Sequence, residues 1–164
     1  MKYADLHIHS NYSDGVKSPE EIIDSAIKDN IKYISITDHD SIAAQYITKN
    51  NYEGINIIPG IELSSEYKEM ELHILGYFMD IDNKALQEVV NELNTQRIKR
   101  VENILFKLKE YDIKLELEDL AIDIDATVGR SHVANAMVRK GYFNNYKSAF
   151  RNFLIQGKPG YVKG

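Results

Sequence analysis

The chain has 164 residues, of which 43% are hydrophobic, and its formal net charge is −5 at pH 7. This length suits one domain with an appendage, and this apolar content predicts a folded core rather than disorder. The absence of cysteine excludes disulfides and thiolate metal sites, and the absence of an 18-residue apolar run excludes a helical membrane span. No signal peptide is recognised before the first motif, and the lack of cysteine fits the cytoplasmic location that we expect.

The first 80 residues predict alternating strands and helices. Residues 2–8 alternate between apolar and polar side chains, so a strand here presents Asp5, His7 and His9 on one face. The next segments predict a helix capped by Ser18, a strand over 31–37 and a helix from a Ser41 cap to about Lys49. A strand over 55–58 that ends near Glu62 follows, and a hairpin through 67–71 leads into a strand over 73–78. Parallel βα units of this kind place their functional groups at the carboxyl ends of the strands.

The sequence changes to a helical period near residues 80–83. Apolar residues recur every three or four positions from 83 to 111, and shorter helices are expected over 117–122, 131–140 and 146–155. Gly141 and Gly157 are expected to end the last two helices. The sequence thus predicts an α/β part over residues 1–80, followed by an all-helical part.

Imidazoles and carboxylates gather at the ends of the predicted strands. Four of the five histidines and one glutamate fall there, within a single α/β unit. Nitrogen and oxygen ligands suit divalent metal ions, so this pattern predicts a metal centre and a metal-dependent hydrolase. The candidate ligands are His7, His9, Asp14, His39, Glu62 and His73, and Asp5 and Asp38 are expected to orient them from the surrounding shell.

Each candidate also has an ordinary explanation when it is taken alone. The first two histidines could be a surface or core pair, and Asp14 lies in an Asp-Gly pair that is common in turns. Asp40 could serve only as an acid at a helix start, His73 as a half-buried strand residue, and Asp5 as a surface acid. Their shared placement at strand ends favours the metal centre.

The segments D-L-H-I-H-S, S-D-G, T-D-H-D, G-I-E-L-S and H-I-L-G-Y, in this order and spacing, resemble the first motifs of the polymerase-and-histidinol-phosphatase (PHP) superfamily. With the later G-R-S-H, the chain is most similar to the stand-alone phosphoesterase branch, which includes nucleotide phosphatases and a 5′ to 3′ exoribonuclease. The resemblance implies a distorted (β/α)7 barrel that holds two or three divalent ions. It implies that His7, His9 and Glu62 hold one ion, that Glu62 bridges to a second ion also held by His73, and that Asp14 and His39 serve a third.

The chain departs from the family pattern at its end. Such proteins usually continue with further strands and further ligands, whereas this sequence stops at Gly164. By the resemblance, residues 1–80 are the first half of the barrel, 81–157 are a helical insertion and 158–164 return toward the barrel. We therefore expect a fragment with an open barrel edge, low activity and a tendency to self-associate.

Charge is divided unevenly along the chain. Residues 1–127 hold all 25 acids and 13 of the basic residues, whereas residues 128–164 hold seven basic residues and no acid. The G-R-S-H segment opens a helix in this basic tail, where free N–H groups favour an anion. In the resembling phosphoesterases the matching Arg and His contact the substrate phosphate, so Arg130 and His132 are expected to do so here. Lys158 and Tyr161 are weaker candidates, and the alternative is a solvated face or a tail that packs against the acidic part.

The sequence therefore predicts a metal-dependent phosphoesterase. Its substrate is expected to be a small phosphomonoester, a nucleotide or a short oligonucleotide end, attacked by metal-activated water with two or three Mn, Fe or Zn ions. No side chain is assigned a catalytic role beyond holding metal, and net acidity argues against long duplex DNA. The alternatives are a non-catalytic metal-binding module of the polymerase-associated type and a histidinol-phosphate phosphatase.

Overall fold

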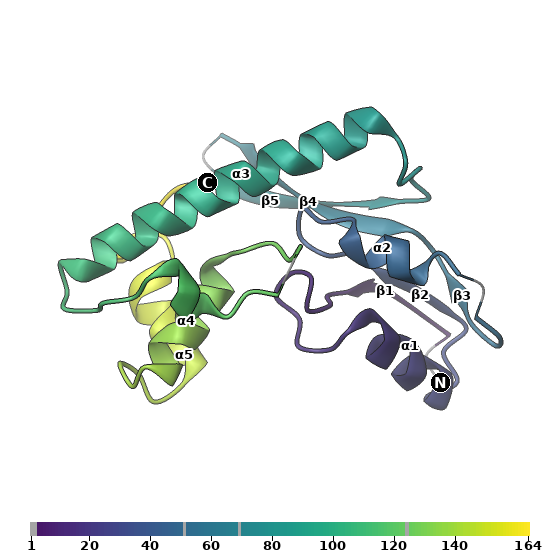
Figure 1. The fold of residues 1–164 in the computed structure, drawn as a ribbon, viewed down its shortest axis with the longest axis horizontal. Helices are drawn as coiled ribbons and strands as arrows, with labels where there is room; N and C mark the ends of the chain where they lie inside the picture. Colours follow the sequence, from purple (N-terminus) through teal and green to yellow (C-terminus); the bar gives the residue numbers. More distant parts are fainter. Residues whose placement is uncertain (1–2, 51, 69, 124) are drawn as a thin grey trace. The chain divides into compact units, whose positions relative to one another are not determined.

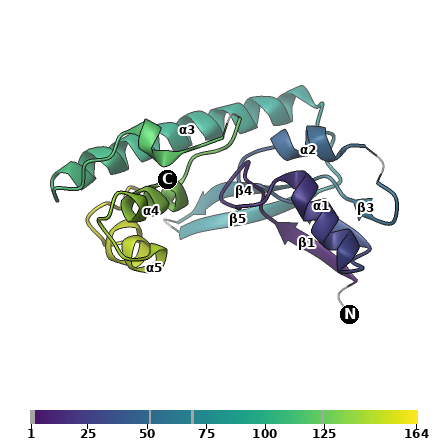
Figure 2. The ribbon, with the colours of Figure 1, turned by 60° about the horizontal axis from the view of Figure 1, so that its bottom comes forward.

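The structure, a computed structural model, describes residues 3–50, 52–68, 70–123 and 125–164 (Figure 1). Its parallel sheet has the order β1-β2-β3, formed by β1 (Ala4–Ile8), β2 (Tyr33–Ile36) and β3 (Asn56–Ile57). Helices α1 (Pro19–Lys28) and α2 (Ala43–Thr48) connect these strands. Two longer strands, β4 (Gly60–Tyr67) and β5 (Met70–Tyr77), pair as an antiparallel hairpin and run side by side in Figure 2. The predicted order of strands and helices is confirmed, except that the third strand is divided into β3 and β4.

Helix α1 begins as its sequence predicts. The Ser18 hydroxyl accepts the amide N–H of Glu21 at 3.3 Å, and the Glu21 carboxylate accepts the amide N–H of Ser18 at 2.8 Å. This reciprocal pair satisfies two amides at the helix start, and Pro19 fits the first turn because it has no N–H to satisfy.

The start of α2 differs from the prediction. The helix begins at Ala43 with Ile42 as its N-cap, so Ser41 is not the capping residue. Asp40 has a φ of 49°, in the left-handed region, and the chain uses the next two residues to turn into the helix. The Ser41 hydroxyl still accepts the Ala43 amide N–H at 3.2 Å and supports the helix from one residue before the cap.

The third predicted strand is interrupted. β3 has only two residues, and Pro59 after it has no N–H to donate to a neighbouring strand. β4 then begins at Gly60, where an added Cβ would lie 2.1 Å from Ser35 Oγ of β2. Glu62 therefore lies inside β4 rather than after a third strand, and the hairpin register fixes its position against β5.

Two compact units make up the chain. The first comprises the described residues up to 94 together with 123 and 125–127, and the second comprises residues 95–122 and 128–164. Buried residues of α1, β2, α2 and the segment before β3 form the main cluster of the first unit, and Ile42, Ile61 and Val90 form a smaller one. The strand β2 is almost wholly buried, so the loop that follows it starts from a rigid base.

The second unit is helical. It contains all but the first turns of α3 (Lys84–Lys109), then the 3₁₀ helix η1 (Leu117–Leu120), α4 (Arg130–Arg139), α5 (Tyr146–Ala149) and the π-helix η2 (Phe150–Leu154). The last predicted helix is thus divided into an α and a π segment. Gly141 and Gly157 have φ angles of 82° and 78°, which confirms them as residues that follow helix ends. None of the helices in the described part of the chain combines the length and the apolar character that a membrane span requires. The domain limits expected at residues 80 and 157 stay a prediction.

Candidate metal centre

Glu62 lies in the middle of a histidine cluster. Its side chain is almost fully buried, and its Oε2 lies 2.9 Å from His7 Nε2 and 3.0 Å from His9 Nε2. Its other oxygen, Oε1, lies 2.8 Å from His73 Nδ1. His39 Nδ1 lies farther away, 3.6 Å from Oε2. One carboxylate therefore faces four imidazole rings.

Asp14 provides a second carboxylate to the same cluster. Its Oδ1 lies 3.2 Å from His9 Nδ1, and its Oδ2 lies 3.9 Å from His39 Nε2. The rings form a continuous row, with centroid separations of 5.1 Å for His7 and His9, 4.5 Å for His9 and His39, and 4.7 Å for His39 and His73. The structure thus brings all six candidate ligands together, and their role as metal ligands stays a prediction.

Backbone pairing at the end of β2 brings His39 and Glu62 together. The two residues form a parallel bridge: the Asp40 amide donates to the Glu62 carbonyl at 2.9 Å, and the Glu62 amide donates to the Asp38 carbonyl at 3.2 Å. These bonds continue the parallel pairing beside β2 from β3 to the first part of β4. The carboxyl end of β2 is therefore adjacent to Glu62, as expected for ligands at strand ends.

The hairpin register adds His73. Ser64 of β4 is directly opposite His73 of β5, and Glu62 lies two residues before Ser64 on the same face of its strand. Diagonal neighbours on one face of an antiparallel pair are within reach of long side chains. This explains how the Glu62 carboxylate can contact an imidazole from β5.

Burial and charge oppose each other in this cluster. Burial alone would raise the pKa of Glu62, but hydrogen bonding and the nearby His7, His39 and His73 lower that pKa below its ordinary value. Burial alone would lower the pKa of His9, but its hydrogen bond to Asp14 and the carboxylate charges raise that pKa above its ordinary value. The carboxylates therefore favour positive charge here, which is also what would attract a divalent cation.

The donor atoms fit divalent ions. Three overlapping groups have ligand atoms within 4.8 Å of one another, namely His7, His9 and Glu62; His9, Asp14 and His39; and His39, Glu62 and His73. Ligands about 2.0–2.2 Å from an ion such as Zn²⁺ lie roughly 3–3.5 Å apart, close to the 2.8–3.9 Å separations in the cluster. Three of the residues belong to two groups each, so the arrangement suits neighbouring ions that share ligands.

The two expected supporting acids differ in their surroundings. Asp38 is fully buried and accepts hydrogen bonds from the Ser10 amide at 2.7 Å, the Ser10 hydroxyl at 2.6 Å and the Ser13 hydroxyl at 2.5 Å. Burial raises the pKa of Asp38, and these hydrogen bonds partly offset the rise. Asp5 is half-buried in β1, in register with Ile34 of β2. The orienting role expected for both acids stays a prediction.

Sequence reasoning missed two residues that hold the backbone of the cluster. Asp40 is fully buried, and its Oδ1 accepts the Ser64 amide N–H at 2.7 Å, so it is more than an acid at a helix start. Its position after a buried strand was a usable signal, because a buried carboxylate needs hydrogen-bond partners. Thr127 donates its hydroxyl to the His39 carbonyl at 2.9 Å from 88 residues away in sequence, and no local pattern indicates this.

The predicted phosphate-binding residues lie in the helical unit. The Arg130 guanidinium packs over the rings of Phe150 and Tyr161, 5.8 Å and 6.0 Å from their centroids. His132 Nδ1 accepts the Gly129 amide N–H at 3.2 Å, at the start of α4. Contacts of Arg130 and His132 with a substrate stay a prediction, as do those of the weaker candidates Lys158 and Tyr161.

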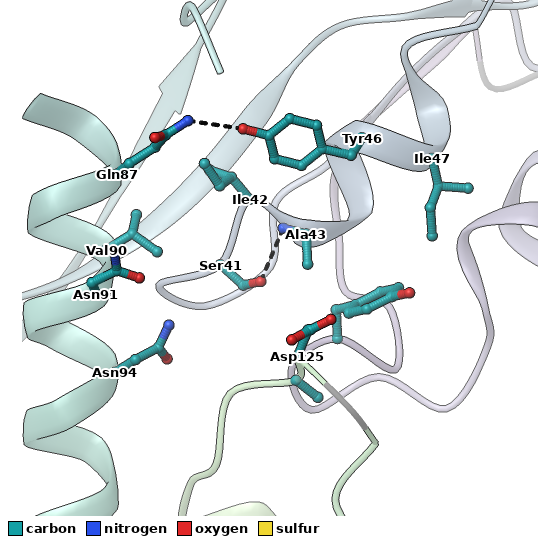
Figure 3. Close-up of a pocket in the computed structure, with 12 residues that line it drawn as sticks. Ser41, Ile42, Ala43, Tyr46, Ile47, Gln87, Val90, Asn91, Asn94 and Asp125 are labelled. Carbon is teal, nitrogen blue, oxygen red and sulfur yellow. Dashed lines mark hydrogen bonds between the residues drawn. The ribbon is translucent and has the colours of Figure 1, made fainter. Parts of the chain in front are cut away.

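A separate hollow of about 700 Å³ lies between α2 and the first part of α3 (Figure 3). Figure 3 shows Gln87, Val90, Asn91 and Asn94 along the α3 wall, and the Gln87 amide donates to the Tyr46 hydroxyl at 3.0 Å. Among the described residues that line this hollow there is no lysine or arginine. We therefore place no phosphate here, and the histidine cluster remains the candidate site.

The chain is similar to proteins named as an exoribonuclease and as a phosphatase. The chain is 31% identical to the 5′-3′ exoribonuclease Rnm of Escherichia coli, over 96% of this chain and 56% of that protein. It is 30% identical to the 3′,5′-nucleoside bisphosphate phosphatase of Chromobacterium violaceum, over 99% of this chain and 58% of that protein.

A solved structure described as an amidohydrolase from Chromobacterium violaceum, with bound sulfate and no metal, superposes with a TM-score of 0.90 at 28% identity. It is matched over 99% of this chain and 58% of its own length. The chain thus spans somewhat more than half the length of these relatives, and it shares the mixed α/β fold of the solved structure. The pattern of the PHP domain matches residues 5–156, and the chain belongs to the PHP domain family.

Proposed function

We propose that this protein is a metal-dependent phosphoesterase. The observation that carries the proposal is the buried Glu62 carboxylate, which lies within 3.0 Å of imidazole nitrogens from His7, His9 and His73. Strands β1, β4 and β5 and their adjoining loops supply these groups. The exoribonuclease and phosphatase relatives support the same class of reaction.

The ligands are proposed to serve two or three ions. His7, His9 and Glu62 would hold one ion, and Glu62 and His73, with His39 close enough to join them, would hold a second. Asp14 and His39 would serve a third, beside His9. Divalent ions bound there would supply Lewis acidity at phosphoryl oxygens and a water nucleophile near neutral pH. The nitrogen and oxygen donors suit Mn, Fe or Zn.

The proposed substrate is a small phosphomonoester, a nucleotide or the end of a short oligonucleotide. Two relatives are named for RNA and nucleoside bisphosphate substrates, and a third is described with bound sulfate, an anion of the shape of phosphate. We propose that Arg130 and His132 contact the substrate phosphate. The lack of acids and the seven basic residues in 128–164 support an anionic substrate.

The wider setting is also proposed from the relatives. We propose that these strands belong to a distorted (β/α)7 barrel and that the protein acts in the cytoplasm. In the sheet, β1 pairs with β2 and stands at the edge, and Ile74 and Leu72 of β5 are 55% and 41% exposed. This edge and these side chains support the proposal that the 164-residue chain self-associates.

The test is metal content and hydrolysis by the purified chain after loading with Mn²⁺ or Zn²⁺. Adenosine 3′,5′-bisphosphate, a short 5′-phosphorylated RNA, histidinol phosphate and a simple anilide would separate nucleotide, RNA, histidinol and amide reactions. We expect bound metal and slow but metal-dependent phosphate or nucleotide release, because the chain is expected to have low activity. Bound metal without hydrolysis of any of them would favour the non-catalytic module, and a chain that takes up no metal would overturn the proposal.

A further inference from the structure

We propose that the two acids that flank His39 position the candidate ligands in two separate groups. Asp38 would fix the loop that carries His9 and Asp14, and Asp40 would fix the strand that carries Glu62. This inference rests on the proposed metal centre. Among the described residues, neither Asp38 nor Asp40 belongs to a group of ligand atoms that could hold an ion.

Asp38 holds both ends of the segment between two candidate ligands. Ser10 follows His9 directly and donates its amide and its hydroxyl to the Asp38 carboxylate, whereas Ser13 precedes Asp14 and donates its hydroxyl to the same group. The loop is closed further by the Ser13 amide, which donates to the Ser10 carbonyl at 3.0 Å. Because Asp38 is at the end of the buried strand β2, the loop is tied to the sheet core.

The same loop has little room to adjust. A Cβ on Gly15 would lie 2.1 Å from the His9 carbonyl oxygen and 2.8 Å from the Ser10 carbonyl oxygen. The backbone after Asp14 therefore folds back tightly onto the backbone of His9. Removing the Asp38 carboxylate would leave three donors without their acceptor, and a loop this compact would have to move as a unit to satisfy them.

Asp40 holds the backbone of β4 at Glu62 and just after it. Its amide donates to the Glu62 carbonyl at 2.9 Å, and its Oδ1 accepts the Ser64 amide N–H at 2.7 Å. Ser64 is directly opposite His73 in the hairpin, so the same bond also fixes the position of His73 relative to Glu62. Asp40 itself is held from α3, because Asn94 Nδ2 donates to the Asp40 carbonyl at 3.3 Å.

These contacts predict that each acid controls different imidazoles. Asp38 acts on the loop side of His39, and Asp40 acts on the hairpin side. Ligands have to be held within about 0.5 Å of their productive positions, so loss of one anchor is felt at the ligands it holds. A general loss of stability would instead affect all four rings alike.

The experiment is a Zn²⁺ titration of the 164-residue chain, followed through the imidazole NMR signals of His7, His9, His39 and His73. In Asp38→Ala we expect the His9 signal to need about 10–100-fold more Zn²⁺ for half of its shift, the range for partners that orient ligands, while His73 changes less than threefold. In Asp40→Ala we expect the larger change at His73 and a smaller one at His9, because the Glu62 that Asp40 anchors also belongs to the group of His7 and His9.

Two further variants separate positioning from folding. Asp40→Asn keeps an oxygen that can accept the Ser64 amide, so it should restore the His73 response to within threefold of wild type. Ser18→Ala removes the α1 cap and lowers stability without contact to the cluster, so it should leave all four responses unchanged.

The outcomes distinguish this inference from the proposed function. If wild-type protein shows no saturable Zn²⁺ response, the metal centre itself is wrong. If wild type responds but each variant weakens the Zn²⁺ responses of His9 and His73 equally, or weakens neither, then the proposal that Asp38 and Asp40 position different ligands is wrong.

Discussion

Replacing Glu62 with glutamine should damage metal binding more than replacing any other single member of the cluster. Glu62 is buried, its two oxygens lie within 3.0 Å of three imidazole nitrogens, and it belongs to two of the three ligand groups. Glutamine keeps the shape of the side chain and one oxygen, but it removes the charge and replaces the other oxygen with an NH2 group that cannot bind a cation.

The expected size follows from these contacts. Loss of a partner that only orients a ligand typically costs about 10–100-fold in metal affinity. Glu62 would itself be a ligand, shared by two ions, so we expect at least about a 100-fold loss, equivalent to about 2.7 kcal/mol. Phosphoesterase activity should fall with metal content, because both depend on the same carboxylate.

The assay is equilibrium Zn²⁺ or Mn²⁺ competition against a chromogenic chelator, with bound metal counted after desalting. Glu66→Gln is the matched control, because Glu66 is on the same strand but exposed near the hairpin turn. Its affinity and stoichiometry should stay within about twofold of wild type. Unchanged metal stoichiometry in Glu62→Gln would refute the reasoning, because loss of a carboxylate shared between two ions must weaken the binding of both.

Three other changes have defined outcomes. Arg130→Ala should raise the KM for a phosphate ester roughly tenfold, because it removes a charge-assisted hydrogen bond, and metal content should be retained. The exposed Arg151→Ala is the control. Equal kinetics in the two variants would show that Arg130 serves only in packing. Gly60→Ala should lower the free energy of unfolding by about 1–3 kcal/mol in urea titrations, because the added Cβ would lie 2.1 Å from a side-chain oxygen of β2. Gly76→Ala is the control and should change this free energy little, because the nearest atom to its Cβ would be 3.4 Å away. Ser18→Ala should cost about 1 kcal/mol in the same assay, and an unchanged midpoint would show that the α1 capping box contributes nothing.

The fold was predictable where local chemistry decides it. The Ser18 cap and the glycines at 141 and 157 act within one turn of chain, and the structure has them as expected. The division of the third strand was not predictable in the same way. Glycine is required at position 60 because Ser35 of another strand lies too close for a Cβ. Such a contact between strands does not alter the pattern of apolar and polar residues in either strand.

The candidate ligands were predictable as residues, and their contacts were not. Placement at strand ends and in the adjoining loops identified six side chains. The family resemblance paired His39 with Asp14, whereas the geometry also places His39 in a group with Glu62 and His73. That neighbourhood depends on the bridge between the end of β2 and β4, a long-range pairing. Thr127 was beyond sequence reasoning for the same reason, because it is near His39 only after the chain has folded.

The D-H-D tripeptide at the end of β2 connects these observations. A buried acid at a strand end is unfavourable unless its oxygens are satisfied, and here the donors that satisfy Asp38 and Asp40 come from the chain beside the other ligands. The hydrogen bonds that make burial of these acids acceptable therefore also fix the ligand-bearing segments relative to His39. Stability and site geometry depend on the same bonds, so substitutions at either acid should not separate them fully, whereas Asp40→Asn, which retains the acceptor, should keep both.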